Sequence, residues 1–322
     1  MDVIWIDPAG AVAEAGADDL VELAARPDGT VWVDLPEPND ADVATLGSVF
    51  GFDPADLAEC LTRSMVPKVL PRDGYSFFIL HTLDDAGHLL ELDAFLGRNY
   101  FVTVHGPLTP GVPLELALIE TRATLAKARS GTLRVTTPVQ LATDVIGGIE
   151  DSLEELLFKT AAAAGSLDRR AREGDTGQPE TFLEELFHVR HGLLTVRNRS
   201  GQSRQACETL GHFASSADDK RLFEDLERRF ERLTSLCDGE REFVQGVLDF
   251  FESITNTRIN AAMNRLTLIS FVVLPASALI GFFGISSISY AETSMRDTLI
   301  FAVVLMLLTF VTLRWTKSKG WW

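Results

Sequence analysis

Residues 266–283 read LTLISFVVLPASALIGFF, a run of 18 residues without a charged side chain that begins directly after Arg265. As a helix rising about 1.5 Å per residue, this run would be roughly 27 Å long, close to the hydrocarbon thickness of a bilayer. A second apolar run, residues 298–313, follows after a loop of 14 residues. Lipid offers no partners to backbone amides, so both runs are predicted to be helices. Together they predict a transmembrane hairpin.

Basic residues flank this predicted hairpin at both of its ends. The loop of residues 284–297 carries one arginine against two acidic residues, whereas the flanks carry Arg258, Arg265, Arg314, Lys317 and Lys319. Because positive charge is retained on the cytoplasmic side, the loop should lie outside. We therefore expect a multi-pass protein of the plasma (inner) membrane with both termini in the cytoplasm.

The chain of 322 residues has a formal net charge of −17. From residue 256 onward it carries six basic and two acidic side chains, so the acidic excess lies in the first 255 residues. Such a body repels nucleic acid and attracts cations, although the same charge could serve solubility alone. The three cysteines, Cys60, Cys207 and Cys237, are widely spaced, which indicates free thiols in a reducing compartment.

Residues 1–110 are predicted to form a cytoplasmic α/β domain. Asn39 or Asp40 can cap a helix that reaches Phe50, and Asp53-Pro54 can start another. Runs rich in β-branched and aromatic residues predict strands, which should form a small mixed sheet, at 3–6, 31–35, 76–81, 89–95 and 100–104.

The chain after residue 110 is predicted to be helical. Residues 111–214 should contain a hairpin of two long helices, the second starting at a capping box of Thr181 and Glu184. A stalk helix, residues 215–265, follows without a proline and should continue into the first span to make one helix of about 100 Å. The remaining predicted segments are the first span 266–283, the loop 284–297, the second span 298–315 and the basic cytoplasmic tail 316–322.

The membrane end resembles the CorA family of divalent-cation channels and transporters, which are two-span proteins with a Gly-Met-Asn signature. The order and spacing of its first span are matched by residues 260–267 (NAAMNRLT), 274–275 (LP) and 281–284 (GFFG). Weaker matches occur in the soluble part, at 67–69, 99–105 and 246–249. The resemblance thus covers nearly the whole chain.

This resemblance implies a homopentamer shaped as a CorA-like funnel, with no enzymatic activity. Its partners would be further copies of itself, the lipid bilayer and divalent cations. Five first spans would line a pore. The pore-lining positions that the resemblance implies in this sequence are Asn260, Met263, Leu266, Ser270, Leu274, Ser277 and Gly281. A row of Met and Leu can gate a pore by dewetting. The alternative is that Met263, Leu266 and Leu274 are ordinary helix-packing residues.

The chain departs from the family where the signature should stand, because it has Gly284, Ile285 and Ser286. The family's asparagine ring is thought to hold a hydrated cation at the outer mouth. A serine is shorter and its hydroxyl is a weaker acceptor, whereas magnesium keeps its water shell. The predicted cargo is therefore a divalent metal ion of the Mg, Zn, Co or Ni class, with the choice left open.

The family's regulatory metal site, shared between neighbouring subunits, also differs. Its stalk acid falls on Asp225, and the partner position on Cys60 with Glu59 beside it. Such a set would suit a softer ion such as zinc. The alternative is that Asp225 is solvated and Cys60 is a buried small apolar residue. No covalently bound cofactor is expected, only a divalent metal ion as cargo and regulator.

Two other functions are compatible with the sequence. One is a poorly selective or tension-responsive channel that keeps the scaffold and lacks the filter. The other is a non-conducting, membrane-anchored metal sensor in which the hairpin is only an anchor.

Overall fold

The computed structural model describes residues 1–214, 216–288 and 295–318, and it describes the backbone alone at 272, 275, 276, 278, 279, 282–288, 295, 297, 298, 301, 305, 312, 313 and 316–318. The chain forms two compact units, Met1–Val247 and Leu248–Trp322. The first, called here the N-terminal unit, contains a sheet and most of the helices. The second, the C-terminal unit, is helical.

The N-terminal unit is built on a mixed sheet of seven strands in the order β2-β1-β3-β7-β6-β5-β4. The strands are β1 Asp2–Ile6, β2 Val12–Ala15, β3 Thr30–Leu35, β4 Lys68–Pro71, β5 Tyr75–Leu83, β6 Leu89–Gly97 and β7 Tyr100–His105. β3 and β7 pair in parallel, and the other neighbours pair antiparallel. The predicted α/β domain with a mixed sheet is confirmed, and β2 and β4 are additions at its two edges.

Short helices cover one face of this sheet. They are η1 Ala17–Asp19, α1 Leu20–Ala24, α2 Asp40–Phe50 and α3 Pro54–Glu59. Asn39 caps α2 by accepting from the amide of Asp42 at 2.9 Å, and Asp53 caps α3 by accepting from the amide of Ala55 at 2.8 Å. The core beneath them is aromatic, with the ring of Phe52 stacked 4.0 Å from that of Phe95.

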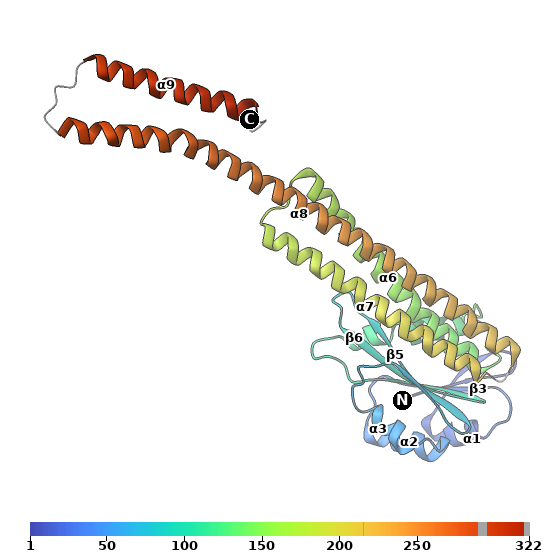
Figure 1. Cartoon of the computed structure of the whole chain (residues 1–322). Coiled ribbons are helices and arrows are strands. Elements are labelled where there is room, and N and C mark those ends of the chain that lie inside the picture. The colour runs from blue at the N-terminus through green and yellow to red at the C-terminus, as the bar shows by residue number, and fades with distance from the viewer. Residues whose placement is uncertain (215, 289–294, 319–322) are drawn as a thin grey trace. The chain divides into compact units, whose positions relative to one another are not determined.

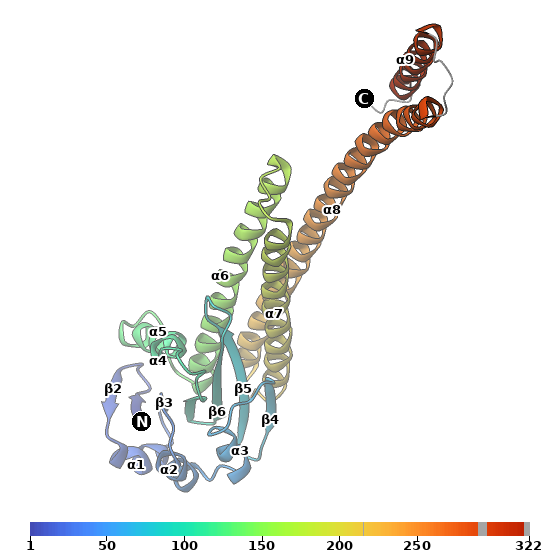
Figure 2. The ribbon, with the colours of Figure 1, turned by 90° about the vertical axis from the view of Figure 1, so that its left-hand side faces the viewer.

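Four helices, two of them long, lie on the opposite side of the sheet, as Figures 1 and 2 show. They are α4 Leu114–Ala117, α5 Ile119–Arg129, α6 Pro138–Glu173 and α7 Pro179–His212. α6 and α7 pack against each other and against β5, and α5 packs on α6. The predicted capping box at Thr181 is wrong, because α7 begins two residues earlier. Pro179 occupies the first turn, where its fixed φ and missing N–H are tolerated.

One helix, α8 Ala217–Ile288, runs from the N-terminal unit into the C-terminal unit. Ser216 caps it by accepting from the amide of Asp219 at 3.0 Å. The last helix is α9 Met295–Ser318, and in the C-terminal unit the ring of Trp315 lies 6.2 Å from that of Phe271 on α8. Among the described residues, no helix combines the length and the apolar character that crossing a membrane requires.

Candidate functional site

The residues assigned to a pore share one face of α8. Asn260, Met263, Leu266, Ser270, Leu274, Ser277 and Gly281 recur every three or four positions, and at 100° per residue they fall within a sector of about 120°. In the single chain this face is open, since Met263, Leu266 and Leu274 are 60%, 66% and 68% exposed. Exposed apolar faces of this kind commonly mark a site of interaction with another protein surface or with lipid.

Ser270 shows how a small polar side chain on this face is oriented. Its hydroxyl donates to the carbonyl of Leu266 at 3.0 Å, one turn earlier in α8. The proton is thereby used within the helix, and the lone pairs of the oxygen remain free to accept. A hydroxyl held this way can face a cation or its water shell.

The residues proposed for the outer mouth, Gly284, Ile285 and Ser286, have side chains outside the described residues. Their backbone belongs to α8, which ends at Ile288. Their role as a filter stays a prediction.

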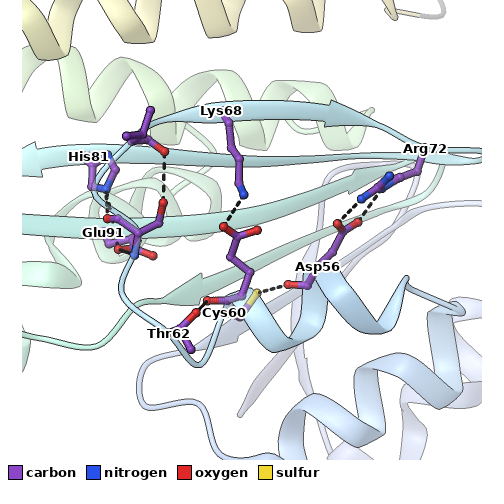
Figure 3. A network of polar contacts seen from close by, with 10 residues as sticks. Asp56, Cys60, Thr62, Lys68, Arg72, His81 and Glu91 are labelled. Carbon is purple, nitrogen blue, oxygen red and sulfur yellow. Dashed lines mark hydrogen bonds and ion pairs between the residues drawn. The ribbon is translucent and has the colours of Figure 1, made fainter.

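The three residues proposed for a regulatory metal differ in burial and in their partners. Cys60 follows α3, is 1% exposed, and its Sγ donates to the carbonyl of Asp56 at 3.4 Å (Figure 3). Glu59 forms an ion pair with Lys68 of β4, and exposed Asp225 on α8 pairs with Arg228 at 3.3 Å. Within the described part of the chain, no group of three or more His, Cys, Asp or Glu residues is arranged to hold a metal ion.

The chemistry of Cys60 weighs against its use as a ligand in this arrangement. Burial, together with the neighbouring carboxyl of Asp93, raises the pKa of the thiol well above its usual value. The thiolate is the form that binds metals, so a ligand role would require the end of α3 to open. The metal assignment of Glu59, Cys60 and Asp225 stays a prediction.

A buried group of titratable side chains next to Cys60 was missed from the sequence. His81 on β5 faces Glu91 on β6, with 3.8 Å between Nε2 and Oε2, and Glu91 Oε2 accepts from the amide of Ser64 at 2.8 Å (Figure 3). Asp93 lies two residues further along β6 and is fully buried. The signal was present in residues 91–95 (ELDAF), because the period of two places both acids on the same face as Phe95.

Asp93 should make the stability of the N-terminal unit depend on pH. Burial, and then the charge of Glu91, raise its pKa well above the usual value, so the native state holds a proton that the unfolded chain loses. The contribution of Asp93 to the free energy of unfolding is present below about pH 4. It is lost as the pH rises toward the pKa of the native state, with a slope of at most about 1.4 kcal/mol per pH unit. Asp93→Asn should flatten the fall in melting temperature between pH 5 and pH 8.

The matched control is Asp218→Asn, which removes an exposed carboxylate at the start of α8. This variant should keep the slope of the parent protein. An equal flattening in both variants, or none in Asp93→Asn, would show that Asp93 is not the group that titrates.

The comparisons with known proteins agree with one another. A family model described as "CorA-like Mg2+ transporter protein" matches residues 27–316. The chain is 25% identical over 312 residues, covering 94% of this chain and 93% of the relative, to a Bacillus subtilis (strain 168) protein named "Putative metal ion transporter YfjQ". It is 20% identical over 331 residues, with 99% of both chains covered, to the cobalt/magnesium transport protein CorA of Methanocaldococcus jannaschii.

A solved structure shares the fold over its full length. The complete structure of the CorA magnesium transporter from Methanocaldococcus jannaschii superposes with a TM-score of 0.79 at 17% identity, covering 100% of this chain and 99% of that one. At this identity the likeness establishes the fold, namely an α/β domain with a long helix.

Proposed function

The chain belongs to the family of CorA-like Mg²⁺ transporter proteins, and from this we propose that it forms a homopentameric membrane channel or transporter for divalent metal cations. The observation that carries the proposal is the family match over residues 27–316, which includes α8 and most of α9. The family is one of transporters, which supports the expectation that the chain is not an enzyme.

In the proposed assembly, five copies of α8 surround the pore with the face that is open in the single chain. Met263 and Leu266 would form an apolar constriction near the cytoplasmic end, where water is expelled when the ring is narrow. Ser270 and Ser277 would offer hydroxyl oxygens on the same face. The hydrogen bond from Ser270 to the Leu266 carbonyl supports this role, because it leaves only acceptor positions toward the pore.

The proposed membrane placement follows from the apolar runs. Residues 266–283 of α8 and 298–315 of α9 would span the plasma membrane as a hairpin, with both termini in the cytoplasm. The contact between the rings of Phe271 and Trp315 supports the pairing of the two helices. The acidic cytoplasmic body would raise the local concentration of cations near the pore.

We expect chemical crosslinking of the full chain in membranes to give a ladder that ends at five copies. A C-terminal tag should be cleaved by protease only in inside-out vesicles. A ladder that ends at two copies, or a tag that is cleaved only from the outside, would contradict the assembly or the topology.

The altered signature leads to a prediction about the ion. Five asparagine amides offer carbonyl oxygens that reach further into the outer mouth than the hydroxyls of Ser286. Ser286→Asn combined with Ile285→Met should therefore increase magnesium uptake by about threefold, which corresponds to roughly 0.7 kcal/mol of ion binding. Hexaamminecobalt, which mimics the hydrated ion, should inhibit this variant more strongly than the parent.

The control is Ile285→Met alone, which lacks the amide and should leave uptake unchanged. If the double variant inserts, assembles and gains neither property, residues 284–286 do not form a degraded magnesium filter.

A regulatory metal is proposed at Asp225 with Glu59, with Cys60 joining only if the end of α3 opens. In an assembly, Asp225 of one copy would approach Glu59 of the next. The exposure of Asp225 on α8 supports its availability for such a contact.

The decisive test is a flux panel in proteoliposomes with Mg²⁺, Zn²⁺, Co²⁺, Ni²⁺ and K⁺. Uptake of divalent ions in preference to K⁺ would support the proposal. Comparable K⁺ flux, or flux that appears only under osmotic tension, would favour a poorly selective or tension-responsive channel. No flux of any ion, with metal binding retained, would favour a non-conducting sensor.

A further inference from the structure

A cavity of about 680 Å³ lies in the N-terminal unit between the sheet and α5. It is on the sheet face opposite α2 and α3, and it shares no residue with the pore face or with the group around Cys60. Ile4, Leu118 and Leu125 give it apolar walls. Its volume is in the range of cavities that hold small organic ligands.

Two carboxylates stand side by side on its sheet wall. Asp2 on β1 is directly opposite Asp34 on β3, and both line the cavity. Like charges at directly opposed positions repel each other and destabilise a strand pair. The carboxylate of Asp2 has no hydrogen bond or ion pair with any residue that the structure describes, so a positive group between the two acids would relieve the repulsion.

Asp34 is held in place for such a contact. It is only 9% exposed, and its Oδ1 lies 2.5 Å from Thr103 Oγ1 and 3.0 Å from His105 Nε2. The Thr103 hydroxyl in turn accepts from the indole N–H of Trp32 at 3.1 Å, so it donates its own proton to Asp34. The second oxygen, Oδ2, makes no hydrogen bond within the described part of the chain, and it is free to bind a ligand donor.

The helix wall of the cavity carries the opposite charge. Arg122 and Arg129 lie two turns apart on α5 and both line the cavity. The guanidinium of Arg129 pairs with Glu14 of β2, whereas the side chain of exposed Arg122 has no hydrogen bond or ion pair to any described residue. One cavity therefore contains two adjacent carboxylates with oxygens that lack partners, and a guanidinium that also lacks one, among the described residues.

We propose that this cavity binds a zwitterionic small molecule, with its ammonium group between Asp2 and Asp34 and its carboxylate or phosphate on Arg122. The apolar walls accommodate the methylene chain between the two charged groups. A bare metal ion fits less well, because two carboxylates with one oxygen already bonded provide too few ligands. The proposal does not depend on which ion the protein carries, or on whether it conducts.

The test uses the full chain in detergent and a matched series of probes. The ω-amino acids from glycine to 6-aminohexanoate carry both charges at increasing separation, whereas putrescine carries only positive charge and butyrate only negative charge. At least one ω-amino acid should raise the melting temperature and bind in calorimetry. Putrescine and butyrate should bind at least about tenfold more weakly, since each loses one charge-assisted contact.

Variants locate the binding. Asp2→Asn and Arg122→Gln change exposed side chains and should each weaken binding by about tenfold, whereas Arg221→Gln, on an exposed site of α8 outside the cavity, should leave it unchanged. The proposal is overturned if no ω-amino acid binds at 10 mM, if putrescine or butyrate binds equally well, or if the affinity is insensitive to Asp2 and Arg122.

Discussion

Replacing both Met263 and Leu266 with serine is expected to raise basal cation flux into proteoliposomes by more than about tenfold. The two side chains lie one turn apart on the open face of α8, and both are large, apolar and well exposed. In a ring of five they would expel water, and a dry constriction stops ions because their hydration shells cannot follow. Serine is smaller and polar, so the constriction should stay wet, and removing only 1.4 kcal/mol from the barrier gives about a tenfold rate.

The matched control introduces two serines on the opposite side of α8. Leu268 and Val272 lie at least 120° from both Met263 and Leu266 on α8, so Leu268→Ser with Val272→Ser introduces comparable polarity away from the proposed pore. Its flux should stay at the parent level. Equal flux from both double variants, in protein that is folded and inserted, would assign Met263 and Leu266 to helix packing.

The second large effect is a loss of stability, expected when the contact between α6 and α8 is disrupted. Glu150 on α6 is fully buried and is paired with Arg229 on α8, which also reaches Asp151 at 2.6 Å. Burial raises the pKa of Glu150, and the charge of Arg229 opposes that rise. Arg229→Gln should therefore leave a buried carboxylate without its counter-charge. The expected loss is about 3 kcal/mol, or roughly 6–12 °C in melting temperature for a unit of this size.

A second ion pair between the same two helices provides the control. Arg232 pairs with Glu154 at 2.8 Å, but its side chain is 62% exposed. Arg232→Gln should lower the melting temperature by less than about 2 °C, because exposed pairs contribute little. Adding Glu150→Gln to Arg229→Gln should recover part of the loss, since the buried charge is then gone. If Arg229→Gln and Arg232→Gln behave alike, burial does not decide the strength of these contacts.

The sequence predicted best those parts of the fold that depend on local signals. The caps at Asn39 and Asp53 are properties of adjacent residues, and the structure has them where expected. β2 and β4 were missed because residues 12–15 (VAEA) and 68–71 (KVLP) are short and carry weak strand signals. Both are edge strands, and only pairing with β1 and β5 makes them regular.

The candidate site was predictable to a lesser degree, for a physical reason. The spacing of Met263, Leu266 and Ser270 fixes a helix face, which the structure has, but this local pattern does not specify what covers that face. Cys60 is buried in one cluster with Ile79 and Phe95, which come from β5 and β6, well separated from it in the sequence. The opposition of Asp2 and Asp34 also required the pairing of β1 with β3, and no local pattern gives that register.

The parallel pairing of β3 with β7 has a consequence for how the protein emerges from the ribosome. Val31 pairs with Tyr100 and Leu35 with Val104, so the centre of the sheet joins segments about 70 residues apart. Asn99 reinforces the junction by donating to the carbonyls of Ala24 and Arg26. Closing such a long loop is slow, and it cannot begin until β7 has left the exit tunnel. The nascent chain up to residue 99 therefore has to be kept from aggregating while β3 and β6 each lack a neighbour on one side, which makes it a natural client for early chaperone binding.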